Sequence, residues 1–232
     1  MSARENILAK LRQAKALPME EPDVAAYYAA AQTWDNEIER LKHWAKAMRA
    51  VKTEIFWVKP HNWAQQMLET ARGKGLKNIL LPLKTGHGRE AAEVFQAAAD
   101  IEIKAFAREI EHWKDEFFNK IDAGFTSARC AIAQTGTLLL WPDADEPRSQ
   151  SLVPPVHFCL LDAGRMYDNF HDAAKGEGMD GKMPTNIVLV SGPSKTADIQ
   201  LTLAYGAHGP RDLVVLAVLP EHIDPVDLED EA

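Results

Sequence analysis

The stretch 53–107, TEIFWVKPHNWAQQMLETARGKGLKNILLPLKTGHGREAAEVFQAAADIEIKAFA, decides the fold. Within it, the short apolar runs TEIFWVK, NILLPL and IEIKAFA alternate with the longer amphipathic segments NWAQQMLETARGKG and GREAAEVFQAAAD. Runs of this kind predict strands that alternate with helices. This order favours right-handed β-α-β crossovers and a largely parallel sheet covered on both faces. The predicted fold class is therefore α/β.

The alternation continues towards the carboxyl terminus with one interruption. We expect helices around 113–118, over 163–174 and after Ser194, together with the strands VHFCLL, NIVLVS and LVVLAVL. In CAIAQTGTLLLW, residues 130–141, two apolar runs are separated only by Gln-Thr-Gly-Thr. Because this gap leaves no room for a crossover helix, it predicts a hairpin or a tight strand-to-strand corner.

The segments that flank the α/β region have different compositions. Residues 1–50 predict a helical extension, with Ser2 as the N-cap of a first helix and a long helix from Asp23 to about Met48. Residues 221–232 are acidic and predict a frayed tail, so that a single α/β domain covers 51–220. The glycine-rich segment 175–183 predicts a mobile loop.

Composition excludes several classes of protein. The 232 residues include 26 Lys and Arg and 34 Asp and Glu, which give a formal net charge of -8. This balance offers no extended surface to neutralise phosphates, so we expect no nucleic-acid partner. No apolar stretch approaches the roughly 18 residues of a membrane span, and the first residues lack the apolar core of a signal peptide. We therefore expect a cytoplasmic protein without a membrane span.

Metal and cofactor chemistry gains no support from the sequence. Cys130 and Cys159 both lie inside apolar runs, where a cysteine behaves as a small hydrophobic residue, and they form no ligand cluster. The motifs G-x-S-x-G and H-E-x-x-H and a complete dinucleotide fingerprint are absent. We expect no metal and no cofactor on this chain, and we find no sign of a serine hydrolase, a zincin or a standard NAD enzyme.

The sharpest candidate site follows the strand NIVLVS, in the segment SGPSKTAD. If a helix begins here, its free backbone N–H groups, two hydroxyls and an ammonium would bind a carboxylate or a phosphate. The alternative is that Ser194 only caps the helix and Pro193 only stiffens the turn. The residues of this predicted anion site are Ser191, Gly192, Ser194, Lys195, Thr196 and Asp198.

Three further segments are candidates. In YGAHGPR, His208 and Arg211 could reach the same anion, unless the segment is a tight turn with a solvated arginine. The segment KTGHG, 84–88, is a weak signal, although it follows a strand where ligands of open α/β sheets usually bind. Small residues and hydroxyls at a strand corner would let a ligand come close, but they suit a plain corner equally well. These last residues are Thr126, Gln134, Thr135, Gly136 and Thr137.

Four of these stretches together resemble a known family. They are RENILAKLR (4–12), GFTSARCAIAQTGTLLL (124–140), LVPPVHFCLLDAGRMYDN (152–169) and SGPSKTADIQLTLAYGAHGPRDLVVL (191–216). They span nearly the whole chain in the order that the LUD family has them, and they are most similar to its lactate-utilisation protein C branch. One position departs from the family, because Gln134 stands where members often have an acid. A glutamine cannot act as a general base or as a carboxylate nucleophile.

The resemblance implies a fold like that of the NagB/RpiA/CoA-transferase group. It also implies a subunit without iron-sulfur clusters that works beside iron-sulfur partner subunits in oxidising L-lactate to pyruvate. The alternative is a stand-alone enzyme or a binding protein for a small anionic ligand of the phosphosugar, folate or CoA type. A regulatory module without turnover and a homo-oligomer also stay open.

Overall fold

The structure is a computed structural model that describes residues 2–14, 19–106, 110–179, 181, 183–197, 203–206 and 208–229. Contacts divide the chain into two compact units, residues 1–31 and 32–232. In the first unit, α1 (Ala3–Gln13) begins with a capping box in which the Ser2 hydroxyl accepts from the amide of Glu5. The N-cap predicted at Ser2 is therefore confirmed.

The long helix predicted from Asp23 to Met48 is wrong, because the segment is broken. α2 (Val24–Ala29) ends early, and α3 (Glu37–Ala50) begins only after Asn36. The Asn36 side chain accepts hydrogen bonds from the amides of Ile38 and Glu39, which is the usual role of an N-cap and starts a new helix there. α3 packs into the core of the second unit.

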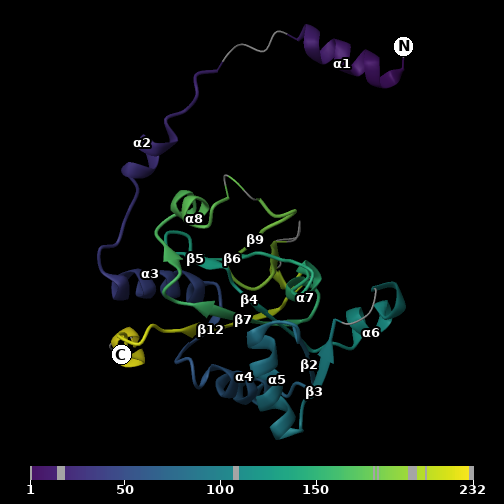
Figure 1. The fold of residues 1–232 in the computed structure, drawn as a ribbon, viewed down its shortest axis with the longest axis vertical. Coiled ribbons are helices and arrows are strands. Elements are labelled where there is room, and N and C mark those ends of the chain that lie inside the picture. Colours follow the sequence, from purple (N-terminus) through teal and green to yellow (C-terminus); the bar gives the residue numbers. More distant parts are fainter. Residues whose placement is uncertain are drawn as a thin grey trace. The chain divides into compact units, whose positions relative to one another are not determined.

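The predicted parallel sheet is confirmed. Six strands lie in the order β1-β12-β7-β4-β2-β3, and every neighbouring pair is parallel (Figure 1). The strands are β1 (Glu54–Val58), β2 (Asn78–Leu81), β3 (Glu102–Ala105), β4 (Ala123–Ser127), β7 (Val156–Asp162) and β12 (Asp212–Val218).

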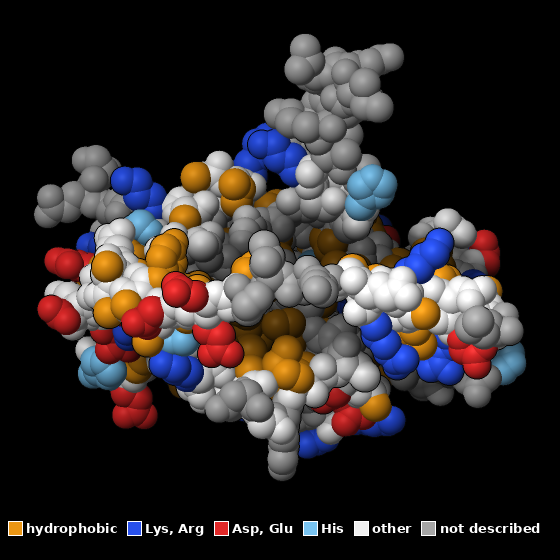
Figure 2. Space-filling view, turned by 90° about the horizontal axis from the view of Figure 1, so that it is seen from above, with side chains coloured by type: hydrophobic (Ala, Val, Ile, Leu, Met, Phe, Trp, Pro, Cys, Tyr) orange, Lys and Arg blue, Asp and Glu red, His pale blue; other side chains and the backbone are white. Residues whose placement is uncertain are grey.

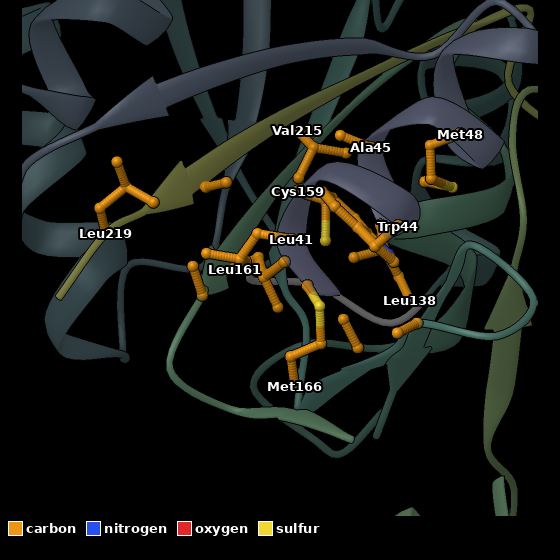
Figure 3. Close-up of a cluster of buried hydrophobic side chains, with 14 of the residues drawn as sticks. Leu41, Trp44, Ala45, Met48, Leu138, Cys159, Leu161, Met166, Val215 and Leu219 are labelled. Atoms are coloured by element: carbon orange, nitrogen blue, oxygen red, sulfur yellow. The ribbon is translucent and has the colours of Figure 1, made fainter. Parts of the chain in front are cut away.

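Helices α4 (Trp63–Gly73) and α5 (Gly86–Ala98) cover one face of this sheet. On the other face, Trp44 and Met48 of α3 pack against Cys159 and Val215, as Figure 3 shows. The 3-10 helix η2 (Pro225–Leu228) joins the same core, where Leu228 is buried. The frayed tail is therefore wrong for this segment, because a buried apolar side chain anchors it.

A second sheet of four strands lies over the face that α3 covers, in the order β8-β5-β6-β9. β5 (Cys130–Ile132) and β6 (Thr137–Leu140) are antiparallel, as the hairpin prediction required. The edge strands are β8 (Met166–Tyr167) and β9 (Val188–Val190). The helix expected over 163–174 starts late, because β8 occupies its first part and α8 (Phe170–Gly176) begins after Asn169.

The helix predicted after Ser194 is wrong. β10 (Lys195–Ala197) instead pairs antiparallel with β11 (Leu203–Tyr205). Next to this pair the Ser194 amide donates to the carbonyl of Pro210, and the Gly206 amide donates to the carbonyl of Ser194. The backbone N–H and C=O groups of this segment are therefore hydrogen-bonded to residues more distant in sequence, instead of to one another within a helix. Asp198 lies outside the described residues.

β4 was not anticipated as a strand of the central sheet, because its residues AGFTS read as a corner. The strand contains Gly124 because any larger residue would clash at this position. A Cβ atom there would come within 2.2 Å of the Gln150 backbone oxygen. The missing side chain lets α7 (Arg148–Leu152) pack directly across β4. η1 (Ile110–His112) and α6 (Lys114–Asn119) connect β3 to β4, which confirms the helix expected around 113–118.

Two findings concern the surface. Within the described ranges, none of the helices is long and apolar enough to cross a bilayer. Figure 2 shows basic, acidic and apolar side chains interspersed on the face that it presents, without a continuous basic surface among the coloured residues.

Candidate functional site

Two neighbouring strands of the parallel sheet continue in opposite directions. After β2 the chain passes through α5 to β3 at the edge of the sheet, whereas after β4 it proceeds towards β7 on the other side. In open α/β sheets, ligands bind outside the carboxyl ends of the strands at such a switch point. The residues that follow β2 and β4 are therefore the first place to look for a site.

A cavity of about 340 Å³ opens at this switch point. We call it the carboxyl-edge crevice. Its walls come from the segment after β2, the end of β4 and the loop before α7, and most of its side chains are polar. The lining residues are Thr85, His87, Ser127, Arg129, Trp141, Asp143 and Glu146.

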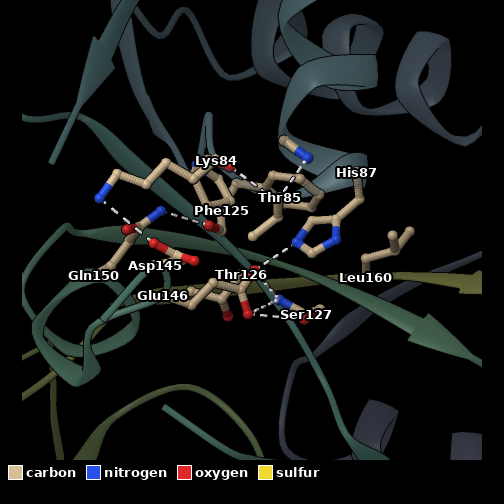
Figure 4. A network of polar contacts seen from close by, with 12 residues as sticks. Lys84, Thr85, His87, Phe125, Thr126, Ser127, Asp145, Glu146, Gln150 and Leu160 are labelled. Carbon is tan, nitrogen blue, oxygen red and sulfur yellow. Dashed lines mark hydrogen bonds and ion pairs between the residues drawn. The ribbon is translucent and has the colours of Figure 1, made fainter. Parts of the chain in front are cut away.

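Glu146 is the centre of a polar network in this crevice. Its Oε1 lies 2.5 Å from Nε2 of His87, and its Oε2 accepts from the Ser127 hydroxyl at 2.8 Å (Figure 4). The Ser127 amide also donates to Glu146, at 3.1 Å. Nearby, Lys84 and Asp145 form an ion pair at 3.5 Å. These contacts tie the loop before α7 to the β2–α5 connection and fix the orientation of the His87 ring.

The sequence KTGHG places His87 at the start of α5. Thr85 caps the helix by accepting from the Gly88 amide at 3.0 Å. A Cβ atom at Gly88 would come within 2.0 Å of the Pro82 carbonyl oxygen, so only glycine permits this close turn. The His87 ring then meets the Phe125 ring edge to face, with centroids 5.6 Å apart. The weak sequence signal at 84–88 thus lies in the most promising part of the sheet.

Arg129 is the cation of the crevice. Its Nε donates to Glu177 at 2.6 Å, and its guanidinium carbon lies 5.4 Å from the centroid of the Trp141 ring. Its two terminal nitrogens have no partner among the described residues, although they are the pair that grips a carboxylate. The arginine is thus held at one end and open at the other.

The partner of Arg129 is itself buried. The Glu177 side chain is only 1% exposed and also accepts from Arg165 and from the Tyr167 hydroxyl. Burial by itself raises the pKa of Glu177, but the hydrogen bonds from Arg165, Arg129 and Tyr167 outweigh it and hold the pKa below its ordinary value. The mobile loop expected over 175–183 is therefore wrong at Glu177, which is anchored.

Four residues of the predicted anion site share a different hollow. Ser191, Gly192, Ser194 and His208 line a pocket of about 180 Å³ that also contains His157. It lies at the amino ends of β7 and β12, so we call it the amino-edge pocket. The pocket is thus at the opposite end of the strands from the carboxyl-edge crevice.

The cationic groups predicted for this site do not line the pocket. Lys195 and Arg211 are both exposed, and Arg211 pairs with Asp212 at 3.4 Å. The Ser194 amide is occupied, as described above, and β10 stands where the sequence predicted the start of a helix. Thr196 belongs to β10.

The third group of predicted residues divides between packing and the amino-edge pocket. Thr126 Oγ1 lies 2.8 Å from Nε2 of His157, and Thr137 Oγ1 lies 2.7 Å from the Ser191 hydroxyl and 2.7 Å from that of Thr135. Gly136 has a φ of 57° and packs closely on Ala47 of α3. Gln134 is exposed and lines neither hollow.

Sequence reasoning missed Arg129, Trp141 and Glu146. Arg129 follows a strand that was not recognised, and Glu146 lies in the irregular segment before α7. A polar residue directly after a central strand is the signal that could have identified Arg129, once β4 was placed in the sheet.

Both cysteines are free and buried. Burial raises the pKa of the Cys130 thiol to about 12, and burial likewise raises that of Cys159. Among the residues that the structure describes, no group of three or more His, Cys, Asp and Glu side chains could hold a metal ion.

Comparison with known proteins places this architecture in a family. The LUD domain matches residues 41–218. Over its whole length the chain is 64% identical to an uncharacterized protein of Neisseria meningitidis serogroup B, with 100% of both chains covered.

More distant relatives carry a functional name. Lactate utilization protein C of Oceanobacillus iheyensis is 28% identical over 53% of this chain and 54% of its own length. The protein of that name from Deinococcus radiodurans is 32% identical over 43% of this chain and 48% of its own length. These matches thus span about half of each relative.

A solved structure supports the fold. A DUF162 family protein from Deinococcus radiodurans is 17% identical, with a TM-score of 0.56 over 80% of this chain and 99% of that one. At this identity, the likeness concerns the fold alone. Since the family match covers most of the sequence, the chain belongs to the LUD domain family.

Proposed function

We propose that this protein serves lactate utilisation as a subunit without iron-sulfur clusters in a complex that oxidises L-lactate to pyruvate. We further propose that the carboxyl-edge crevice binds the small 2-hydroxy or 2-oxo acid. The names of the relatives support the first part. The second part rests on one observation, the meeting of Arg129 with the His87–Glu146 pair in a single cavity.

The chemistry of the crevice suits an acid with an oxygen on the neighbouring carbon. The open end of the Arg129 guanidinium would bind the carboxylate through two parallel hydrogen bonds. The His87 ring, held by Glu146, would hydrogen-bond to the adjacent hydroxyl or carbonyl. Trp141 beneath the arginine limits its motion, which lowers the entropy lost on binding.

The oxidation itself needs an acceptor for two electrons, and the proposal assigns this to iron-sulfur partner subunits. Cluster ligation needs thiolates, and the raised pKa values of Cys130 and Cys159 oppose thiolate formation on this chain. In this arrangement the present chain binds and orients the acid, and its partners carry the redox chemistry.

Calorimetric titration of the full chain tests the crevice. We expect L-lactate and pyruvate to bind, whereas lactamide, which lacks the charge, and propionate, which lacks the oxygen, bind at least about tenfold more weakly. Arg129→Gln should abolish binding, and His87→Gln should reduce the preference for L-lactate over propionate. Arg72→Gln serves as the control, because Arg72 is an exposed arginine that pairs with Asp100 and does not line the crevice.

Binding of L-lactate that is unchanged in Arg129→Gln, or no binding of either acid, would refute the crevice as the site. Stabilisation of the chain against heat by a phosphosugar, a folate or CoA, without an effect of L-lactate, would favour the stand-alone enzyme or binding protein. Purification of the chain from its source at low salt tests the complex separately. A preparation that retains no iron-sulfur protein would refute the subunit role, whatever the crevice binds.

A further inference from the structure

The amino-edge pocket differs from the crevice in its electrostatics. Its walls are mainly aliphatic, and its polar groups are hydroxyls and histidines. Among the described lining residues there is no Lys, Arg, Asp or Glu. Representative wall residues are Leu152, Val190, Pro193, Pro210 and Leu213. Moving an ion from water into apolar surroundings without a counter-charge costs about several kcal/mol. Such a pocket therefore favours an uncharged occupant.

His157 supplies the polar group that points to a ligand. This residue of β7 lines the pocket and is only 1% exposed. Its Nε2 is occupied by the Thr126 hydroxyl, whereas its Nδ1 has no partner among the residues that the structure describes. Burial lowers the pKa of His157 to about 4, so the ring is neutral at neutral pH. A neutral imidazole with one nitrogen occupied offers the other as a single donor or acceptor.

A second polar point lies on another wall of the same pocket. The Ser191 hydroxyl is 2.7 Å from that of Thr137, which in turn contacts Thr135. These hydroxyls hold one another in place, so Ser191 presents an oriented but uncharged group. The pocket therefore combines apolar walls with two fixed neutral hydrogen-bonding points.

We propose that the amino-edge pocket binds an uncharged six-membered heteroaromatic ring that carries a hydrogen-bonding group. The size fits, because the pocket measures about 180 Å³ and an apolar cavity of about 150 Å³ takes up benzene. The ring would lie against the aliphatic walls, and its polar group would satisfy Nδ1 of His157. This site is separate from the carboxyl-edge crevice and does not depend on the function proposed for it.

Nicotinamide and nicotinate provide a matched pair of probes, since they share a ring and differ in charge. We expect nicotinamide to bind the full chain and to shift the amide resonances of Ser191, Gly209 and Leu213 in NMR spectra. Nicotinate should bind at least tenfold more weakly. The reverse order would overturn the proposal in favour of an anion site. Failure of nicotinamide, benzamide and uracil alike to bind would overturn it altogether.

Two variants of His157 separate its two nitrogens. In His157→Gln the amide nitrogen can replace Nε2 towards Thr126, but nothing replaces Nδ1. In His157→Asn the amide lies near the position of Nδ1. We expect His157→Gln to lose at least tenfold in nicotinamide affinity, while His157→Asn retains most of it. Equal affinity in both variants would contradict the role of Nδ1.

Because His157 is buried, a variant that leaves it untouched is also needed. Leu152→Trp should fill the pocket and abolish nicotinamide binding without changing the far-ultraviolet circular dichroism. Val226→Trp, at a residue of η2 that is 64% exposed and outside the pocket, is the matched control. Nicotinamide affinity that is unchanged in Leu152→Trp would refute the site.

Discussion

The carboxyl-edge crevice and the amino-edge pocket lie at opposite edges of the same parallel sheet, and a histidine contributes to the lining of each. In the crevice, the side chain of His87 is 23% exposed and pairs with the carboxylate of Glu146. In the pocket, His157 is 1% exposed and pairs with the hydroxyl of Thr126. His87 therefore has a charged partner and access to solvent, whereas burial beside a hydroxyl lowers the pKa of His157 and keeps its ring neutral. The comparison teaches that partner and burial, rather than residue type, decide what each histidine can do.

The short helix α7 lies between these two regions. Glu146, just before it, lines the crevice, and Ser151 and Leu152, at its end, line the pocket. Both depend on the close approach of α7 to β4 at Gly124. A change at this contact should therefore affect both regions, whereas changes elsewhere should affect only one.

Gly124→Val should have the largest effect. The new side chain would overlap the Gln150 backbone, where even a Cβ atom comes within 2.2 Å, so we expect a loss of about 3 kcal/mol in the free energy of unfolding. Urea denaturation measures it. Gly73→Ala is the control, since a Cβ atom there meets nothing within 4 Å and alanine favours the helix. A small effect at Gly124 would mean that α7 can move away, and the link between the regions would fail.

The acid sensitivity of the pocket should be the next largest effect. His157 has a pKa of about 4 in the fold against an ordinary 6.5, so below pH 6.5 the unfolded chain takes up a proton that the folded chain refuses. The contribution of His157 to the free energy of unfolding is complete above pH 6.5. As the pH decreases below 6.5, this contribution falls by about 1.4 kcal/mol per pH unit, hence by about 2 kcal/mol at pH 5. Urea denaturation at pH 7, 6 and 5 should show this slope in the wild type and a shallower one in His157→Gln. Equal slopes would show that His157 does not stay neutral.

Glu177→Gln tests the crevice alone. The buried carboxylate holds Arg129 and Arg165, but both arginines are nearly half exposed and water can take over part of their hydration. We therefore expect a loss of about 1.5 kcal/mol at pH 7, together with weaker L-lactate binding. The pKa of Glu177 is lowered in the fold, so the wild type should lose this advantage as the pH falls below 4.5, and the two proteins should converge. A variant that binds L-lactate normally would show that Glu177 does not position Arg129.

Thr137→Val should have the smallest effect. The substitution keeps the shape and removes the hydroxyl that joins Thr135 to Ser191, at a cost of about 1 kcal/mol. Nicotinamide affinity should fall by a few fold, and L-lactate affinity should stay the same. A change in L-lactate affinity instead would mean that the two regions are coupled through more than α7.

Much of the fold could be predicted because its signals are local. Apolar runs identified β1, β2, β3, β7 and β12, and the gap in CAIAQTGTLLLW identified the β5–β6 hairpin. β4 escaped because AGFTS has few large apolar residues, and its glycine is needed for contact with α7 rather than for the strand itself. The helix expected after Ser194 failed for a related reason, since the partners of that backbone lie in β11 and near Pro210.

The candidate site was predicted less well than the fold. Of the residues that the sequence singled out together, Ser191 and His208 line one pocket, whereas Lys195 and Arg211 are not among its lining residues. It gave KTGHG little weight, because two glycines before a helix are common and nothing local connects His87 with Glu146.

By itself, the sequence determined the α/β class, through the periodicity of its apolar residues, and the family, through four motifs in order. The tertiary structure alone decided which polar residues meet. Strand order places the switch point between β2 and β4, and strand order depends on packing between segments far apart in the chain. The physical reason is that periodicity is a property of neighbouring residues, whereas a crevice or a neutral buried histidine is a property of the surroundings that the whole fold assembles.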